Sequence, residues 1–519
     1  MDVQEYLSRD FVLGELLARN ARKYPDKTAF KEGGRSFSYS QYNFRVNKLA
    51  SAFSGLGIGR GDKVAVLLFN GIEIMDCYFA LAKLGAVAVP VNFRFVGPEI
   101  VYIADNSDSV ALVYDSSFER VIDAAKDQMT GVKNYIGVGP VEVSYALNYE
   151  EFLSGGSGVE PLVMISDNDP AHIMYTSGTT GKPKGAVLTH KNQYSNIMLN
   201  LIERPARHED VFLCIPPLFH EAALALTMHN VFMGSTVIIH RQFDPRAIME
   251  TVAGERVSTL FLVPAMWNFL LQIPDLDKYD VSSIRTAITG AAIMPLNLKR
   301  RLLEIFPGLQ LYDCFGQTEM SPVTTILKPA DTLRKPTSVG KPIVGVEVRA
   351  VDSEGNDVPV GEVGEIIYRG PGMMLEYYRN PGATRESIVD GWFHSGDLVR
   401  IDEEGFVYVV DRKKDMVISG GENVYPAEVE EVLYRHENIL EAAVIGISSE
   451  KWGEAVHAVV VTKPGQTLTE AEVKNFCAVN LAGYKKPQSV EFIEALPRNA
   501  AGKVLKTKLR EKHGTAIKY

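Results

Sequence analysis

Cysteine is scarce in this chain, and its four residues lie far apart. Cys77, Cys214, Cys314 and Cys477 form no C-x-x-C pair, which excludes the cysteine-based zinc sites and thioredoxin-type sites that such pairs indicate. Isolated cysteines in a chain of 519 residues are typical of a reducing compartment. We therefore expect a cytoplasmic protein.

The chain also lacks a long, uninterrupted apolar run. Its most apolar stretch, FALAKLGAVAVPV, is broken by Lys83 and Pro90 and is too short to cross a bilayer. The N-terminal residues MDVQEYLSRDFVLGELL contain no basic segment followed by an apolar one. We therefore predict neither a signal peptide nor a transmembrane segment.

An excess of positive charge is absent as well. The chain has 54 Lys and Arg against 64 Asp and Glu, a net charge of −10. This balance disfavours non-specific binding of DNA or RNA, which depends on a basic surface. A polyanion such as a nucleotide must then be bound by local groups. With 46% hydrophobic residues, the composition is that of an ordinary globular protein.

Helical and strand patterns alternate over most of the chain. KVAVLLFN, a helix around IEIMDCYFALAKLGA and then VAVPVN alternate early, and AHIMYT, VFLCIPP and STVIIH continue the series after Asp169. Such alternation predicts βαβ units around mostly parallel, buried strands. Residues 339–410 are β-rich, and a compact α+β pattern follows. We predict an α/β fold with βαβ subdomains, a β-rich subdomain and a small C-terminal α+β domain. FLSGGSGVE, residues 152–160, is a candidate joint between subdomains.

The stretch MYTSGTTGKPKGAVLTH, residues 174–190, contains three glycines, four threonines and two lysines between apolar runs. Glycines allow close backbone approach, and successive N–H groups with Ser and Thr hydroxyls can surround phosphate oxygens. The stretch is not a Walker A motif, because Thr176 stands where the first glycine belongs and Pro183 follows Lys182. It indicates an anion-binding loop, and a flexible linker is the alternative.

Four further stretches carry chemical groups but are weak alone. YDCFGQTEM could place an aromatic ring against a base and Glu319 near Mg²⁺, which prefers oxygen ligands, although a turn before a helix also explains it. In GWFHSGDLV, Asp397 could accept ribose hydroxyls or form an Asx-turn. DRKKDMVISGGENVYP, with Arg412, could be a solvated charged turn, and in PRNAAGKVLK Lys503 could be a solvated lysine.

Together and in this order, the five stretches resemble the adenylate-forming superfamily of acyl-CoA synthetases, luciferases and peptide-synthetase adenylation domains. GGENVYPAEVE and PRNAAGKVLK are most similar to the acyl-CoA synthetases. The resemblance implies a two-step reaction in which a carboxylic acid and ATP give an acyl-adenylate, and coenzyme A then displaces AMP. It also implies a large adenylation domain, residues 1–412, and a small mobile domain, residues 413–519, with the site between them.

The resemblance implies roles residue by residue. Glu319 corresponds to the Mg²⁺ position, Thr318 to an α-phosphate contact, and Lys503 to the lysine that draws carboxylate and phosphate together by charge. The remaining ATP and AMP contacts implied are Thr176, Ser177, Gly178, Thr179, Thr180, Gly181, Lys184, Gly290, Ala291, Ala292, Asp313, Cys314, Phe315, Gly316, Asp397 and Arg412. Phe315 would stack on adenine, and Asp397 and Arg412 would contact the ribose.

The acyl and thiol sides follow in the same way. His220 corresponds to the residue that gates the acyl pocket, and the predicted pocket residues are His220, Ala223, Trp267, Gly290, Gln317 and Met320. Gly420, Gly421 and Glu422 match the loop of the thiol step, and Lys414 matches the hinge. Asp411 departs from the family, where glycine commonly precedes the arginine.

The predicted pocket does not define the acid. No Arg or Lys stands out in it to pair with a second carboxylate, which favours a mono-acid. The small residues of HEAALALTMHNVF suit an extended alkyl tail, and we favour a medium- or long-chain fatty acid. Trp267 could instead close the pocket around an aryl or cyclic acid. Two further alternatives are an acyl-AMP ligase that loads a carrier protein and a non-catalytic protein of the same fold.

We expect no nucleic-acid partner, and we expect the protein to be a monomer or a homodimer.

One arrangement cannot serve both half-reactions, because Lys503 and the loop of residues 420–422 would compete for one crevice. A hinge at Lys414 resolves this by rotation. We predict that Lys414→Pro impairs acyl transfer to coenzyme A far more than adenylation. Pyrophosphate exchange measures adenylation and coenzyme A consumption measures transfer. Equal losses in the two assays would refute the hinge.

Overall fold

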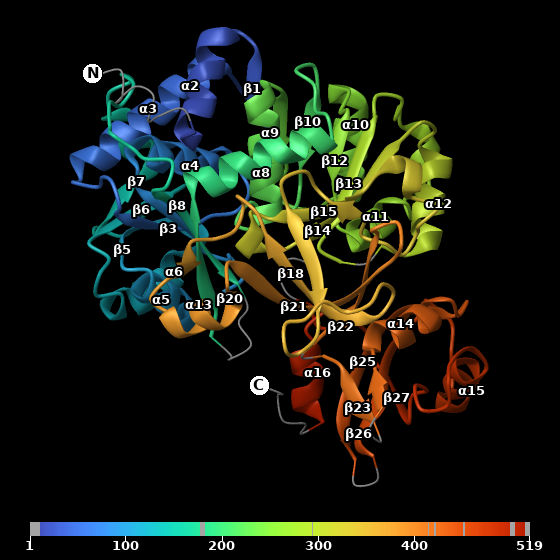
Figure 1. The fold of residues 1–519 in the computed structure, drawn as a ribbon. Coiled ribbons are helices and arrows are strands. Elements are labelled where there is room, and N and C mark those ends of the chain that lie inside the picture. Colours follow the sequence, from blue (N-terminus) through green and yellow to red (C-terminus); the bar gives the residue numbers. More distant parts are fainter. Residues whose placement is uncertain are drawn as a thin grey trace. The chain divides into compact units, whose positions relative to one another are not determined.

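The computed structural model describes residues 11–176, 182–292, 294–413, 415–419, 422–449, 452–498 and 504–513. The chain forms two compact units (Figure 1). The first comprises Met1–Arg334, Pro342–Glu347 and Arg369–Phe393, and the second comprises Lys335–Lys341, Val348–Tyr368 and His394–Tyr519. The predicted domain boundary after residue 412 stays a prediction.

An eight-stranded sheet in the first unit has the order β19-β9-β8-β4-β3-β5-β6-β7. Its strands are β3 (Lys63–Leu67), β4 (Val87–Pro90), β5 (Ser109–Asp115), β6 (Asn134–Val138), β7 (Ala146–Asn148), β8 (Pro170–Thr176), β9 (Lys184–Thr189) and β19 (Glu376–Tyr377). β3 runs parallel to both β4 and β5, as the alternating pattern predicts. β8 and β9 are antiparallel, so the segment that joins them is a hairpin connection.

A nine-stranded sheet has the order β16-β15-β14-β13-β12-β10-β11-β1-β2. Its strands are β1 (Thr28–Glu32), β2 (Arg35–Ser38), β10 (Val211–Cys214), β11 (Thr236–Ile239), β12 (Thr259–Phe261), β13 (Thr286–Gly290), β14 (Gln310–Gly316), β15 (Val323–Leu327) and β16 (Lys341–Pro342). β12, β13 and β14 are parallel. Their carboxyl ends therefore lie at one edge, where ligands bind in open α/β sheets.

Helices cover these sheets (Figure 1). They are α2 (Leu13–Lys23), α3 (Tyr39–Gly55), α4 (Ile72–Leu84), α5 (Gly97–Asn106), α6 (Glu119–Ala125), α7 (Tyr149–Ser154), α8 (His190–Glu203), α9 (Glu221–Met233), α10 (Pro245–Glu255), α11 (Pro264–Leu270), α12 (Leu296–Ile305) and α13 (Pro381–Ser387). Helix α8 packs against β9 of one sheet and β15 of the other, and also against α9. α8 thus links the two sheets, and its polar residues Gln193, Asn196 and Asn200 are buried.

The second unit contains most of a five-stranded sheet, β17 (Glu347–Val351), β18 (Val363–Arg369), β20 (Ile388–Val389), β21 (Trp392–Ile401) and β22 (Val407–Arg412). Its C-terminal part has β23 (Val417–Ser419), β24 (Glu422–Val424), β25 (Ile439–Ser449), β26 (Gly453–Thr462) and β27 (Ser489–Phe492), with helices α14 (Pro426–Tyr434), α15 (Glu470–Asn480) and α16 (Lys506–Lys512). The predicted β-rich region and α+β ending are confirmed. No helix among the described residues is long and apolar enough to cross a membrane.

The stretch of residues 152–160 lies within the first unit, and its interpretation as a joint between subdomains stays a prediction. Glu160 forms an ion pair with the buried Lys83 of α4. Lys83 Nζ also donates to Asn47 Oδ1 of α3 over 2.7 Å. A buried ammonium group needs such partners, and they hold this glycine-rich segment against the first unit.

Helix α9 begins with a buried carboxyl group. Glu221 is 3% exposed, and Gln193 Nε2 of α8 donates to Glu221 Oε1 over 2.7 Å. Burial raises the pKa of Glu221 to about 8, although the hydrogen bond from Gln193 opposes the shift. At pH 7 the neutral acid therefore predominates in the folded protein.

This pKa predicts how stability changes with pH. In the unfolded chain the pKa of a Glu is about 4.3. At pH values between that and about 8, Glu221 therefore binds a proton in the folded state that it does not bind in the unfolded state. Stability from Glu221 is complete below this window and is lost as the pH rises through it, by up to about 1.4 kcal/mol per pH unit. Relative to Glu221→Gln, the wild type should lose free energy of unfolding from pH 5 to 8.

Denaturant unfolding at several pH values measures this difference, because the other ionisable groups are common to both proteins. The exposed Glu250 of α10 provides the control, since Glu250→Gln should leave the pH profile unchanged. Parallel profiles for the wild type and Glu221→Gln would contradict the prediction.

Candidate active site

The predicted phosphate loop falls between β8 and β9 in the sequence. Thr176 ends β8 and pairs with Lys184 at the start of β9. Lys182 Nζ lies 5.2 Å from the centre of the Tyr102 ring, and Lys184 Nζ lies 5.2 Å from the centre of the Tyr377 ring. Cations over aromatic faces are held without a carboxylate, so two ammonium groups stand at the base of the loop.

Glu319 connects this hairpin to two other segments. Thr176 Oγ1 donates to Glu319 Oε1 over 3.2 Å, and the Tyr377 hydroxyl donates to the same oxygen over 2.8 Å. Burial and the Glu319 carboxylate raise the pKa of Tyr377, so this hydroxyl remains a donor. Within the part of the chain that the structure describes, no lysine or arginine forms an ion pair with Glu319. Its charge is positioned by hydroxyl groups and is not neutralised by them.

The turn that carries Glu319 is fixed from two sides. Thr318, Glu319 and Met320 form a single 3₁₀ turn, η4 (Thr318–Met320). Asn196 Nδ2 of α8 donates to the Met320 carbonyl over 3.2 Å, and the Met374 N–H donates to the Glu319 carbonyl over 2.7 Å. The positions of Thr318 and Glu319 therefore depend on α8 and on residues that follow β18.

The ends of β13 and β14 approach closely. Gly290 pairs with Cys314, and a Cβ atom on Gly290 would lie 2.5 Å from the Cys314 carbonyl oxygen, so only glycine fits there. The next residue, Ala291, has φ +64°, an uncommon conformation for a residue with a side chain. Sequence resemblance placed these residues beside adenine, and the structure places Gly290 and Cys314 side by side.

Asp313, one of the predicted ATP and AMP contacts, already has a partner. Lys299 Nζ of α12 lies 2.8 Å from Asp313 Oδ2, and both side chains are buried. Burial raises the pKa of Asp313, and the Lys299 ammonium opposes that shift. Sequence reasoning missed Lys299 as the partner of Asp313, because a lysine on a helix with exposed polar neighbours gave no signal of burial.

Two residues predicted for the acyl pocket, His220 and Ala223, lie at the N-cap of α9 and within this helix. His220 is the N-cap residue of α9, and its Nε2 atom is buried without a hydrogen-bond partner among the described residues. Burial lowers the pKa of His220 to about 4, so its imidazole is neutral at pH 7. Ala223 is buried on the same helix. Gln317 is the N-cap residue of η4, and Met320 is its last residue.

Trp267 lies in a hydrophobic core. It is fully buried among residues such as Ile248 and Leu302, and its ring centre is 6.5 Å from that of Phe306. This packing is that of a structural residue, and the acyl-pocket role of Trp267 stays a prediction.

The two predicted ribose contacts lie together in the second unit. Asp397 on β21 pairs with Arg412 on β22, and Arg412 Nε lies 3.0 Å from Asp397 Oδ1. The departure from the family at Asp411 has a structural reason. Its Oδ2 atom accepts a hydrogen bond from the Ala427 N–H over 2.9 Å, in the first turn of α14, where a carboxylate is favourable.

Several predicted residues lie outside the described residues. They are Ser177, Gly178, Thr179, Thr180 and Gly181 of the loop, the hinge residue Lys414, Gly420 and Gly421 of the thiol step, and Lys503. Glu422 is described and begins β24. Tyr377 was missed by sequence reasoning, because its role depends on the pairing of β19 with β9, which no local pattern indicates.

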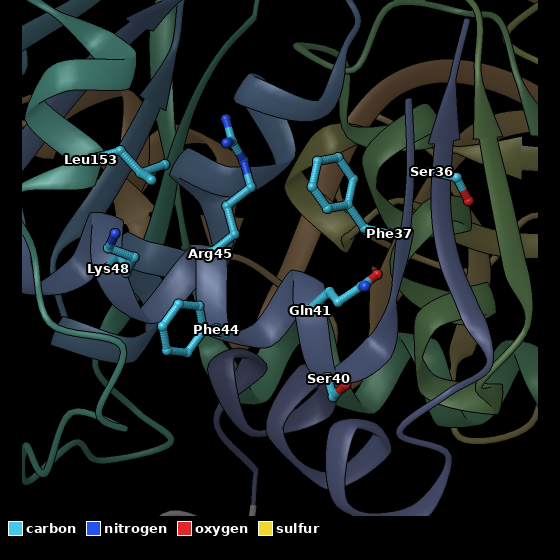
Figure 2. Close-up of a pocket in the computed structure, with 8 residues that line it drawn as sticks. All are labelled: Ser36, Phe37, Ser40, Gln41, Phe44, Arg45, Lys48 and Leu153. Atoms are coloured by element: carbon cyan, nitrogen blue, oxygen red, sulfur yellow. The ribbon is translucent and has the colours of Figure 1, made fainter. Parts of the chain in front are cut away.

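A pocket elsewhere in the first unit contains none of the predicted residues (Figure 2). It is lined by Ser36, Phe37, Ser40, Gln41, Phe44, Arg45, Lys48 and Leu153. The guanidinium group of Arg45 already forms ion pairs with Asp76 over 2.8 Å and with Glu150 over 2.6 Å. We therefore do not assign this pocket as the active site and keep the candidate site at Glu319.

Comparison with known proteins identifies the family. The AMP-binding enzyme family matches residues 17–378, and the AMP-binding enzyme C-terminal domain matches residues 428–503. Feruloyl-CoA synthase of an Amycolatopsis species is 38% identical over 97% of this chain and 99% of its own length. The long-chain-fatty-acid–CoA ligase FadD13 of Mycobacterium tuberculosis is 37% identical, with coverage of 97% and 99%.

Solved structures agree. A fatty acyl CoA synthetase of Mycobacterium tuberculosis superposes with a TM-score of 0.79 at 36% identity, covering 98% of this chain and 99% of that one. The anthranilate CoA ligase AuaEII in complex with anthranoyl-AMP gives 0.90 at 26% identity, covering 96% and 97%. With both domains matched in order, this chain belongs to the adenylate-forming family of AMP-binding enzymes and is an AMP-forming acyl-CoA synthetase.

Proposed function

We propose that this acyl-CoA synthetase activates a medium- or long-chain fatty acid, and that the residues singled out above carry the two half-reactions. The observation that most directly supports these residue roles is the set of hydrogen bonds around Glu319. A buried carboxylate that accepts hydrogen bonds from Thr176 and Tyr377 lies at the base of the hairpin that carries the loop. This arrangement suits a site where phosphate oxygens and their counter-ion meet.

In the first half-reaction, a carboxylate oxygen of the acid attacks the α-phosphorus of ATP. A new P–O bond forms, the bond to the β-phosphate oxygen breaks, and pyrophosphate leaves with that electron pair. Two anions must approach, so cationic groups lower the barrier. Lys182 and Lys184 would hold the leaving pyrophosphate, and Lys503 would bridge carboxylate and α-phosphate. Losing one such interaction costs about 2.7–4 kcal/mol of transition-state stabilisation.

Glu319 fits the Mg²⁺ that the family uses. Mg²⁺ prefers hard oxygen ligands and is held by one or two carboxylates together with phosphate oxygens. The Glu319 carboxylate has hydroxyl partners but no cationic one among the described residues, so it can offer its charge to a metal ion. Mg²⁺, when bound, offsets phosphate charge, while Thr176 and Tyr377 keep the carboxylate oriented.

The adenosine part would be held by pairs that are already formed. Asp313 keeps one oxygen on Lys299, which leaves the other available for the adenine amino group. Asp397 and Arg412, paired over 3.0 Å, present an acceptor and donors for the ribose hydroxyls. Because these ion pairs exist before the nucleotide binds, little side-chain entropy is lost on binding.

In the second half-reaction, the thiol of coenzyme A attacks the acyl carbonyl carbon. A C–S bond forms, the C–O bond to the phosphate breaks, the thiol proton is lost, and AMP leaves. The loop of Gly420, Gly421 and Glu422 would admit the pantetheine arm. His220, neutral at pH 7 because burial lowers its pKa to about 4, would not repel or attract a charged group as it gates the acyl side.

The preference for a fatty acid is supported by α9. Ala223 and Ala225 are small and buried there, which leaves room for an alkyl chain. Trp267 packs against Phe306 in the core, so we do not invoke it to shorten the acyl pocket. An aryl acid is the second candidate, because feruloyl-CoA synthase at 38% identity and an indoleacetate–CoA ligase of Aromatoleum aromaticum at 37% act on aromatic acids by name.

A panel of straight-chain fatty acids from short to long and of common aromatic acids separates these candidates. We expect coenzyme A-dependent AMP release to be fastest with a medium- or long-chain fatty acid. Fastest turnover of an aromatic acid would replace that assignment with the aryl one. Pyrophosphate release without consumption of coenzyme A would instead favour an acyl-AMP ligase that loads a carrier protein.

Tyr377→Phe removes one of the two hydrogen bonds that the Glu319 carboxylate accepts among the described residues. A hydrogen bond to a charged group contributes about 1.5–3 kcal/mol, so we expect the Mg²⁺ concentration for half-maximal adenylation to rise roughly tenfold. This Mg²⁺ concentration is measured by following the rate of pyrophosphate exchange while MgCl₂ is titrated.

The neighbouring tyrosine supplies a matched control. Tyr378 donates to Asp108 Oδ2 over 2.9 Å at an exposed position, so Tyr378→Phe also loses a tyrosine–carboxylate bond. Its Mg²⁺ dependence should equal that of the wild type. Equal behaviour of the two variants would remove Tyr377 from the site.

A further inference from the structure

Two histidines and a glutamate meet on the C-terminal part of the second unit. His457 lies on β26, Glu491 lies on β27, and His513 follows α16. β26 and β27 are parallel, and His457 pairs with Ser489. Because side chains alternate along a strand, Ser489 and Glu491 lie on the same face as His457.

Three ligand atoms converge there. One nitrogen of each imidazole and one carboxylate oxygen all lie within 4.8 Å of one another. His513 Nε2 is 3.0 Å from Glu491 Oε2, and His457 Nε2 is 3.8 Å from the same oxygen. The two rings lie side by side, with centres 4.4 Å apart. Zn–N and Zn–O distances in proteins are about 2.0–2.2 Å, so the three atoms would have to move closer together to share one ion.

His457 gives an independent indication that something binds here. Its side chain is 4% exposed, and its Nε2 atom has no hydrogen-bond partner among the described residues. Its other nitrogen, Nδ1, lies 2.7 Å from Ser489 Oγ. A hydroxyl or carbonyl on one nitrogen commonly orients a histidine whose other nitrogen binds a metal. Leaving a buried polar atom unpartnered is otherwise unfavourable.

We propose that His457, Glu491 and His513 form a zinc-binding site. Two imidazoles and one carboxylate are a usual ligand set for Zn²⁺, with a fourth position left for water. Mg²⁺ prefers oxygen ligands alone, so this site would not compete for the metal ion of the nucleotide. Lys512, which forms an ion pair with Glu491 through the other carboxylate oxygen, leaves Oε2 facing the histidines.

The test uses the full-length protein, dialysed against a chelator and titrated with ZnCl₂ in a calorimeter without nucleotide. We expect one equivalent of zinc to bind, and binding to weaken at least tenfold in His457→Gln and His513→Gln. Ser489→Ala should weaken binding less, by loss of orientation only. His436, which contacts the Phe476 ring on the same unit, is the control, and His436→Gln should bind zinc like the wild type.

A second measurement detects the ligands directly. Replacing Zn²⁺ with Co²⁺ should produce visible absorption bands of a nitrogen- and oxygen-bound ion that disappear in His457→Gln. AMP release should be unchanged in every variant, because none of these residues is assigned to the reaction, and this shows that the variants fold. Absence of zinc binding, or equal binding by the double variant of both histidines, would overturn the proposal.

Discussion

The site depends on one shared hydrogen-bond acceptor, the Glu319 oxygen that Thr176 and Tyr377 both contact. These three residues come from η4, β8 and β19, which are distant in the sequence. Because a buried carboxylate must keep its partners, moving any one segment leaves Glu319 poorly satisfied. The hairpin with the phosphate loop, the turn with Thr318 and the strand β19 are therefore held in one arrangement.

An acidic protein that handles two anionic substrates needs local cationic groups. Lys182 and Lys184 lie over aromatic rings, and neither forms an ion pair with a carboxylate among the described residues. Lys299 and Arg412 are instead paired with Asp313 and Asp397. In the proposed function, the first arrangement leaves charge for phosphate, and the second leaves oriented polar atoms for the nucleoside. The net charge of −10 gives no indication of either.

Much of the fold could be predicted because it depends on local patterns. The alternation of apolar runs and helical periodicity indicated β3, α4, β4 and the parallel sheets, and the α+β ending was visible from Pro426 onward. The glycine content of residues 152–160 does not reveal that Glu160 pairs with the buried Lys83. Tyr377 and Lys299 were missed since their roles depend on burial and pairing across long sequence separations.

The sequence by itself determined the chemistry, since the order of its motifs carries the residue types that adenylation requires. The same sequence also contains the residues of the proposed zinc site. Only the tertiary structure decided which groups meet: that Trp267 packs in the core, that Asp411 binds the start of α14, and that His457 lies beside Glu491. The physical reason is that a motif is local, whereas burial and hydrogen-bond partnership arise only when distant segments pack together.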